Sequence, residues 1–132
     1  MTPGPRIRVD TASGTPAVRQ IADQLRVLLV DGQLPPGVAL PSVRRLAMEL
    51  GVHFNTVAEA YRQLAAEGWL ELKHGRTALV VHREVRQLTD RNKVNEFRDR
   101  LRGLVAQMRA EGVPAPRIAA ELRDIAKLMR QT

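Results

Sequence analysis

Residues 32–75, GQLPPGVALPSVRRLAMELGVHFNTVAEAYRQLAAEGWLELKHG, decide the fold. The stretch holds two short helical patterns that are separated only by Gly51, Val52 and His53. The first begins at Pro41-Ser42, with Ser42 as N-cap, and Gly51 suits the left-handed position after its end. The second covers residues 54–67, with an apolar stripe at Val57, Ala60, Tyr61 and Leu64. Two short helices on so tight a link predict a helix-turn-helix.

The segments on either side extend this unit to residues 15–82. Downstream, residues 69–73 and 77–82 are typical of two strands, and residues 74–76 of the turn between them. Upstream, Thr15-Pro16 is a helix-start signal, with Thr15 as N-cap, and apolar spacing predicts a helix over 16–31 that ends at Gly32. Residues 38–40 predict a short extended piece. Helix, helix, helix and hairpin together predict a winged helix-turn-helix.

The two ends of the chain have different characters. Residues 1–14 contain Pro, Gly, Ser and Thr, which predicts a flexible segment in which Ile7 and Val9 form at most a short strand. After residue 83, helical spacing runs from Glu84 to Glu111, and again over 116–130. We therefore expect a mainly α (α+β) chain, in which a two-helix tail over 83–132 follows the winged helix.

Composition excludes several classes of protein. The 132 residues are 44% hydrophobic and contain no cysteine, so a packed core is expected, and a disulfide framework, a thiolate metal site and a cysteine nucleophile are excluded. The sequence has no Gly-rich phosphate loop, nucleophile elbow or carboxylate pair, and its three histidines lie in separate elements. We expect no enzyme activity, no cofactor and no metal. Without an apolar run of roughly 20 residues, a cytoplasmic protein without a membrane partner is expected.

The net charge of +7 is unevenly distributed. Residues 1–85 hold ten Lys/Arg against eight Asp/Glu, a net +2, whereas residues 86–132 hold eleven against six, a net +5. A basic protein of this size is often a nucleic-acid binder, but here the excess lies in the tail. The argument for DNA binding therefore depends on the pattern of residues 15–82 rather than on the charge.

That pattern resembles the DNA-binding domain of the GntR family of transcriptional regulators. The shared features are a Gly-x-Leu-x-Pro-Gly turn, Leu-Pro-Ser-x-Arg, a Leu-Gly-Val turn, Asn-Thr-Val and a Leu-x-x-Glu-Gly run. The positions in register are Gly32, Leu34, Pro36, Gly37, Leu40, Pro41, Ser42, Arg44, Leu46, Ala47, Leu50, Gly51, Val52, Asn55, Thr56, Val57, Leu64, Glu67 and Gly68. Residues 55–61, NTVAEAY, followed by only two helices, resemble the short YtrA-like branch.

Four of the candidate DNA contacts lie at the starts of the two short helices. Arg44 is placed for a phosphate or a guanine edge, and the resemblance implies the same role; the alternative is a solvated arginine. Arg45 either contacts phosphate or is simply exposed. Asn55 suits adenine, and Thr56 a phosphate or a thymine methyl, although both side chains also suit helix capping.

The remaining candidates lie where this chain departs from the family or at the predicted wing tip. His53 either contacts phosphate or is only a cap, and Phe54 packs either on a thymine methyl or on Trp69. Ala58 occupies a position that can be arginine in the family, which leaves the operator sequence open. Glu59 either forms an exposed ion pair with Arg62, which we expect, or accepts from cytosine. The predicted wing-tip contacts are His74, Gly75 and Arg76; the alternative is an ordinary exposed hairpin turn.

The tail carries an apolar seam at alternating spacings of three and four residues, which favours helix association. Its members are Val94, Phe97, Leu101, Leu104, Met108, Ile118, Leu122, Ile125 and Met129. A winged-helix core of this size is too small to cover two such helices. The two tail helices either pack only on each other within one chain or also bind a second copy. The uncovered seam favours the homodimer, as the resemblance also implies. A small-molecule effector between the tail helices is left open, without candidate residues.

These features predict a dimeric regulator, most simply a repressor, that binds double-stranded DNA at an inverted repeat through helix 54–67 and wing 69–82. Two alternatives stay open. Phe54, Ala58 and the low charge of residues 1–85 favour a protein–protein adaptor that kept the fold. The +5 tail favours an architectural DNA binder without sequence preference.

Overall fold

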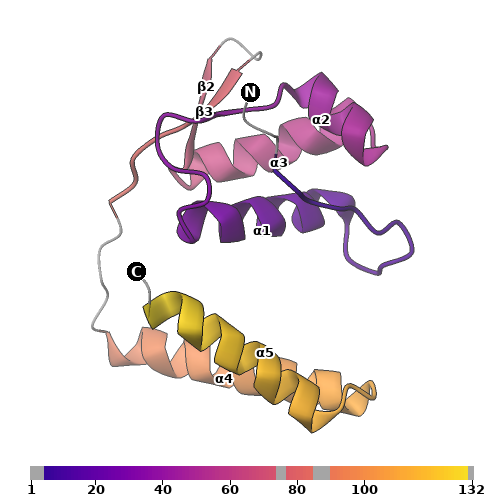
Figure 1. The fold of residues 1–132 in the computed structure, drawn as a ribbon, viewed down its shortest axis with the longest axis vertical. Coiled ribbons are helices and arrows are strands. Elements are labelled where there is room, and N and C mark those ends of the chain that lie inside the picture. Colours follow the sequence, from indigo (N-terminus) through magenta and orange to yellow (C-terminus); the bar gives the residue numbers. More distant parts are fainter. Residues whose placement is uncertain (1–4, 74–76, 85–89, 131–132) are drawn as a thin grey trace. The chain divides into compact units, whose positions relative to one another are not determined.

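The computed structural model describes residues 5–73, 77–84 and 90–130 (Figure 1). By its internal contacts the chain divides into two units, Met1–Glu84 and Val85–Thr132. None of the helices in the described part of the chain combines the length and the apolar character that a membrane crossing requires.

The N-terminal unit has the element order expected for a winged helix. Its elements are α1 (Ala17–Val30), β1 (Ala39–Leu40), α2 (Val43–Leu50), α3 (Phe54–Ala66), β2 (Leu70–Lys73) and β3 (Thr77–Val80). The strands form an antiparallel sheet in the order β1-β3-β2, with Leu40 opposite Ala78 and Leu70 opposite Val80. The sequence predicted residues 38–40 as extended, but it did not show that they add a third strand to the hairpin.

The core of this unit forms around α3, which packs against α1, α2 and β2. The predicted apolar stripe of α3 is confirmed, because Val57, Ala60, Tyr61 and Leu64 are at most 2% exposed. From α1 come Ile21 and other buried residues, and the remainder of the core comes from α2 and the strands. Aliphatic burial therefore holds the three helices and the sheet together.

The start of α1 differs from the prediction at two places. Pro16 rather than Thr15 is the N-cap, and no side chain caps the helix. The segment before it was expected to be flexible, yet Ile7 is buried in the core and forms no strand. Glutamines of α1 hold this segment: Gln24 accepts from the Arg8 amide at 2.9 Å and donates to its carbonyl at 2.6 Å, and Gln20 accepts from the Asp10 amide at 2.9 Å. Side-chain amides of α1 thus hold a segment that the sequence predicted as flexible.

The C-terminal unit consists of α4 (Arg91–Ala110) and α5 (Ala115–Arg130). Helix α4 begins at Arg91 rather than near Glu84, because the Asp90 side chain caps it by accepting from the Asn92 amide at 2.9 Å. The predicted break after Glu111 is confirmed, with Gly112 at φ +99°. Neither helix contains a buried residue among those described.

Candidate nucleic-acid interface

The turn between α2 and α3 is set by Gly51. Its φ of +70° lies in the left-handed region, which is strained for a residue with a side chain. The amide of the next residue, Val52, donates to the Ala47 carbonyl at 3.1 Å. At the other end of α2, Ser42 accepts from the Arg45 amide at 3.2 Å. The predicted start, end and eight-residue length of this helix are therefore confirmed.

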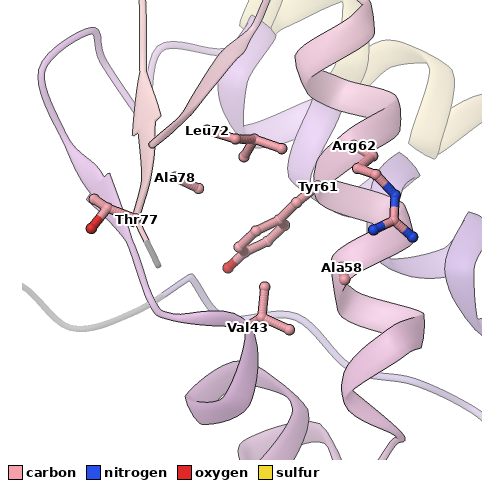
Figure 2. Close-up of a pocket in the computed structure, with 7 residues that line it drawn as sticks. All are labelled: Val43, Ala58, Tyr61, Arg62, Leu72, Thr77 and Ala78. Atoms are coloured by element: carbon pink, nitrogen blue, oxygen red, sulfur yellow. The ribbon is translucent and has the colours of Figure 1, made fainter. Parts of the chain in front are cut away.

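A partly buried hydrogen bond joins the start of α2 to the middle of α3. The Tyr61 hydroxyl donates to the Pro41 carbonyl at 2.7 Å. Burial, with a smaller contribution from Glu49, raises the pKa of Tyr61, so the phenol keeps its proton and stays a donor. Figure 2 shows this ring beside a cavity of about 90 Å³ between α2, α3 and the hairpin. The sequence predicted Tyr61 only as an apolar residue, because Pro41 lies 20 residues away in the chain.

The two arginines at the start of α2 differ in their partners. Arg45 pairs with Glu49 one turn later, at 3.1 Å. Arg44 is exposed, and among the described residues no carboxylate or hydrogen-bond acceptor contacts its guanidinium. The sequence explains the difference, because the residue one turn after Arg44 is Met48. Arg44 therefore presents its full set of donors to solvent.

His53 is the N-cap of α3, and its Nδ1 accepts from the Asn55 amide at 3.1 Å. This is the capping role that the sequence left open for His53. It also rules out the capping alternative for Asn55 and Thr56, since the imidazole occupies that place. Asn55 is exposed, and its side-chain amide makes no hydrogen bond to the described part of the chain. Thr56 is half-buried.

Phe54 packs against His53. The alternative in which Phe54 packs on Trp69 is therefore wrong. The two rings are stacked, with centroids 4.6 Å apart and planes at 29°. Trp69 instead lies under the Arg83 guanidinium, 4.7 Å from the ring centroid. Phe54 keeps 50% of its surface exposed at the first turn of α3. On the outer face of α3, the expected ion pair is present, with Arg62 Nη2 2.7 Å from Glu59 Oε2.

The wing is described up to Lys73 on β2 and from Thr77 on β3. The predicted tip contacts, His74, Gly75 and Arg76, lie outside the described residues, and their role stays a prediction. Within the described ranges no group of three or more His, Asp or Glu side chains has the arrangement of a metal site.

The base of the wing is held by contacts that the sequence did not predict. Arg26 on α1 makes two hydrogen bonds to the carboxylate of Glu67. Its Nε donates to Oε1 at 2.8 Å, and its Nη2 donates to Oε2 at 2.6 Å. The hydrogen bonds from Arg26 lower the pKa of Glu67 and raise that of Arg26. Arg83 donates to the Glu67 carbonyl at 2.8 Å, beyond the end of α3. Arg26 and Glu67 are 41 residues apart, so no local pattern could have revealed their pairing.

Comparison with known proteins identifies the arrangement. The family model described as "Bacterial regulatory proteins, gntR family" matches residues 17–80, from α1 to the end of β3. The HTH-type transcriptional repressor YtrA of Bacillus subtilis is 31% identical over 119 residues, covering 90% of this chain and 91% of YtrA. The chain belongs to the gntR family of bacterial regulatory proteins. The predicted GntR resemblance is thus confirmed, and the similarity to YtrA includes the tail as well as the winged helix.

Two solved structures share the fold of the N-terminal unit. YtrA from Sulfolobus acidocaldarius superposes with a TM-score of 0.54 at 36% identity, covering 79% of this chain and 97% of that one. The DNA-binding domain of AraR in complex with operator ORX1 shares the fold, with a TM-score of 0.51 at 19% identity over 56% of this chain and 94% of that one. As a gntR-family protein the chain is a transcriptional regulator with a DNA-binding domain, and its relatives are transcription factors rather than enzymes.

Proposed function

We propose that this chain is a homodimeric repressor that binds an inverted-repeat operator in double-stranded DNA. In this proposal the N-terminal turn of α3 enters the major groove, α2 crosses the phosphate backbone and the hairpin lies beside them. The repressor role is supported by the similarity to the transcriptional repressor YtrA of Bacillus subtilis. AraR, which shares the fold, was solved on an operator.

One observation carries the proposal: the helix-turn-helix keeps one arginine free where DNA would lie. Arg45 and Arg62 are each paired with a carboxylate of their own helix, whereas Arg44 has no such partner among the described residues. An unpaired guanidinium is ready for bidentate contact with phosphate or guanine, because no ion pair has to be broken first.

The start of α3 supports the same orientation. Asn55 is exposed and uncommitted among the described residues, and its side-chain amide suits the N6 and N7 atoms of adenine. The first-turn amides of a helix also attract phosphate. Arg44 and Asn55 therefore offer a positioning contact and a base contact from the two helices of one motif.

The homodimer is supported by the exposure of the tail seam. Phe97 and Ile125 are 64% and 51% exposed, and no described residue of α4 or α5 is buried. Leu101, Met108 and Ile118 are half-buried; the other seam members, Val94, Phe97, Leu104, Leu122, Ile125 and Met129, are exposed. A contiguous apolar face of this kind indicates a protein partner, and a second copy supplies a self-complementary surface. Two copies would place two recognition helices on half-sites about one helical turn apart.

A second candidate function is architectural DNA binding through the tail, favoured by its net +5 charge over residues 86–132. Fluorescence anisotropy of the whole protein on its own upstream DNA and on a scrambled duplex, across a salt series, separates the two. A specific repressor binds its own DNA at least about tenfold more tightly. An architectural binder shows equal affinities and a steep salt dependence. Absence of binding at low salt contradicts both and favours an adaptor.

The Arg44→Ala variant tests the site itself. We expect specific binding to weaken by about 1–3 kcal/mol, because one bidentate contact is lost. The control is Arg19→Ala, which removes the same charge from an exposed side chain of α1. Equal losses in the two variants would show that Arg44 contributes only general charge.

A further inference from the structure

We propose that Phe54 contacts the C5-methyl group of a thymine in the major groove, and that His53 holds its ring in place. This inference rests on the proposed function and adds to it a chemical requirement on the operator: a 5-methylpyrimidine in each half-site. The Phe54 side chain has no group that can hydrogen-bond to a base edge, so its contact selects only for the methyl group.

Phe54 has the position of a residue that contacts base edges in the major groove. It is the first residue of α3, the helix that a helix-turn-helix places in the major groove with its N-terminal residues on base edges. The side chain is 50% exposed, although the core of the same unit is well packed. An exposed aromatic ring at this place loses unfavourable contact with water when an apolar group covers it.

Ala58 extends the apolar surface of Phe54 along α3. Ala58 lies four residues after Phe54 and therefore on the same side of α3. Ala58 is half-buried and lines the cavity beside Tyr61, as Figure 2 shows. Phe54 and Ala58 thus form an apolar strip. Among the four bases only thymine offers an apolar group in the major groove, and phenylalanine and alanine are side chains that contact it.

His53 holds the ring of Phe54 in place. Its Nδ1 accepts from the Asn55 amide at 3.1 Å, which fixes the orientation of the imidazole ring. Phe54 stacks on this ring with centroids 4.6 Å apart. Because the stack exists without DNA, little side-chain freedom is lost on binding, which favours discrimination by a single methyl group.

The experiment starts with the full-length protein and a random duplex library, from which bound sequences are selected and amplified. In the enriched duplex each thymine is then replaced by deoxyuridine, which removes the methyl group and leaves the pairing edge unchanged. We expect one thymine per half-site whose replacement weakens binding about fourfold, the effect of exposing one apolar carbon.

Variants assign that effect to Phe54. The Phe54→Ala protein should bind the thymine and deoxyuridine duplexes equally, and Phe54→Leu should keep part of the difference. Val27→Ala, which shortens a similarly exposed apolar residue on α1 (56% exposed), should keep all of it. His53→Asn retains a good N-cap but removes the stacked ring, so it should fold normally and discriminate less. Circular dichroism of each variant verifies folding.

The outcomes are distinguishable. Enrichment of a specific sequence in which no thymine is sensitive to deoxyuridine overturns the inference and leaves the proposed function standing. A sensitive thymine that stays sensitive in Phe54→Ala also overturns it, because another residue then contacts the methyl group. A library that yields no enriched sequence overturns the proposed function and the inference together.

Discussion

The two units of this chain treat their apolar residues in opposite ways. In the N-terminal unit Ile21, Val57 and Leu64 have no exposed surface, whereas in the tail Phe97 is 64% exposed and Met129 is 66% exposed. Both regions carry apolar residues at helical spacing. Periodicity therefore shows which face of a helix is apolar, but it does not show what covers that face.

The difference follows from the number of packed elements. Two helices, α1 and α2, and the sheet pack against α3, so its apolar stripe is covered on several sides. Two helices in one chain meet along a single line and leave the remainder of each stripe in water. We therefore expect the N-terminal unit to be stable by itself and the stability of the tail to depend on protein concentration. The predictions below test that contrast, from the largest expected effect to the smallest.

Leu64→Ala should destabilise the N-terminal unit by about 2–5 kcal/mol, because it leaves a cavity in a fully buried site. Urea unfolding monitored by the fluorescence of Trp69, the single tryptophan of the chain, measures this loss. The control is Leu104→Ala in the tail, where the same truncation occurs at a 54% exposed position. Equal losses at Trp69 would remove the contrast between the units.

Leu101→Asp should raise the dimer dissociation constant by roughly a hundredfold, about 2.7 kcal/mol, because a charge then lies in the proposed interface. Sedimentation velocity over a concentration series measures it. Ala106→Asp places the same charge on the opposite face of α4 and should leave the dimer intact. A dimer that survives Leu101→Asp would mean that the interface lies elsewhere.

Tyr61→Phe should cost about 1–2 kcal/mol of stability in the N-terminal unit, because the Pro41 carbonyl loses its partly buried donor. The same urea titration measures it. Since the bond links α2 to α3, we also expect weaker DNA binding at temperatures where the variant is fully folded. A change in stability without a change in DNA affinity would limit Tyr61 to packing.

Glu67→Gln should have the smallest effect, about 0.5 kcal/mol, since both side chains of the Arg26–Glu67 pair are 35% exposed and solvent screens them. Because folding lowers the pKa of Glu67, its contribution is present above the ordinary value of 4.5 and is lost as the pH falls through the lowered value. The stability difference between wild type and variant should therefore vanish in acid. Glu59→Gln, whose partner lies in its own helix, is the control for removing a carboxylate.

Much of the candidate site could be predicted from local signals. The Ser42 and Gly51 caps, the stripe of α3 and the Glu59–Arg62 pair each depend on residues within one or two turns of one another, and the structure confirms them. The capping role of His53 was one of two sequence alternatives, because histidine is a weaker cap than the hydroxyl residue usual at that place. The DNA contacts of Arg44, Asn55 and the wing tip stay predictions.

The sequence by itself determined the family, the helix-turn-helix and the apolar faces, because caps, turns and periodicity are encoded by neighbouring residues. Only the tertiary structure decided that Ile7 enters the core and that β1 joins the hairpin. It also decided that the Tyr61 hydroxyl donates to the Pro41 carbonyl and that the Arg26 guanidinium pairs with the Glu67 carboxylate. Each of these contacts joins residues far apart in the chain. Their free energy depends on how whole elements pack, and no local pattern contains that information.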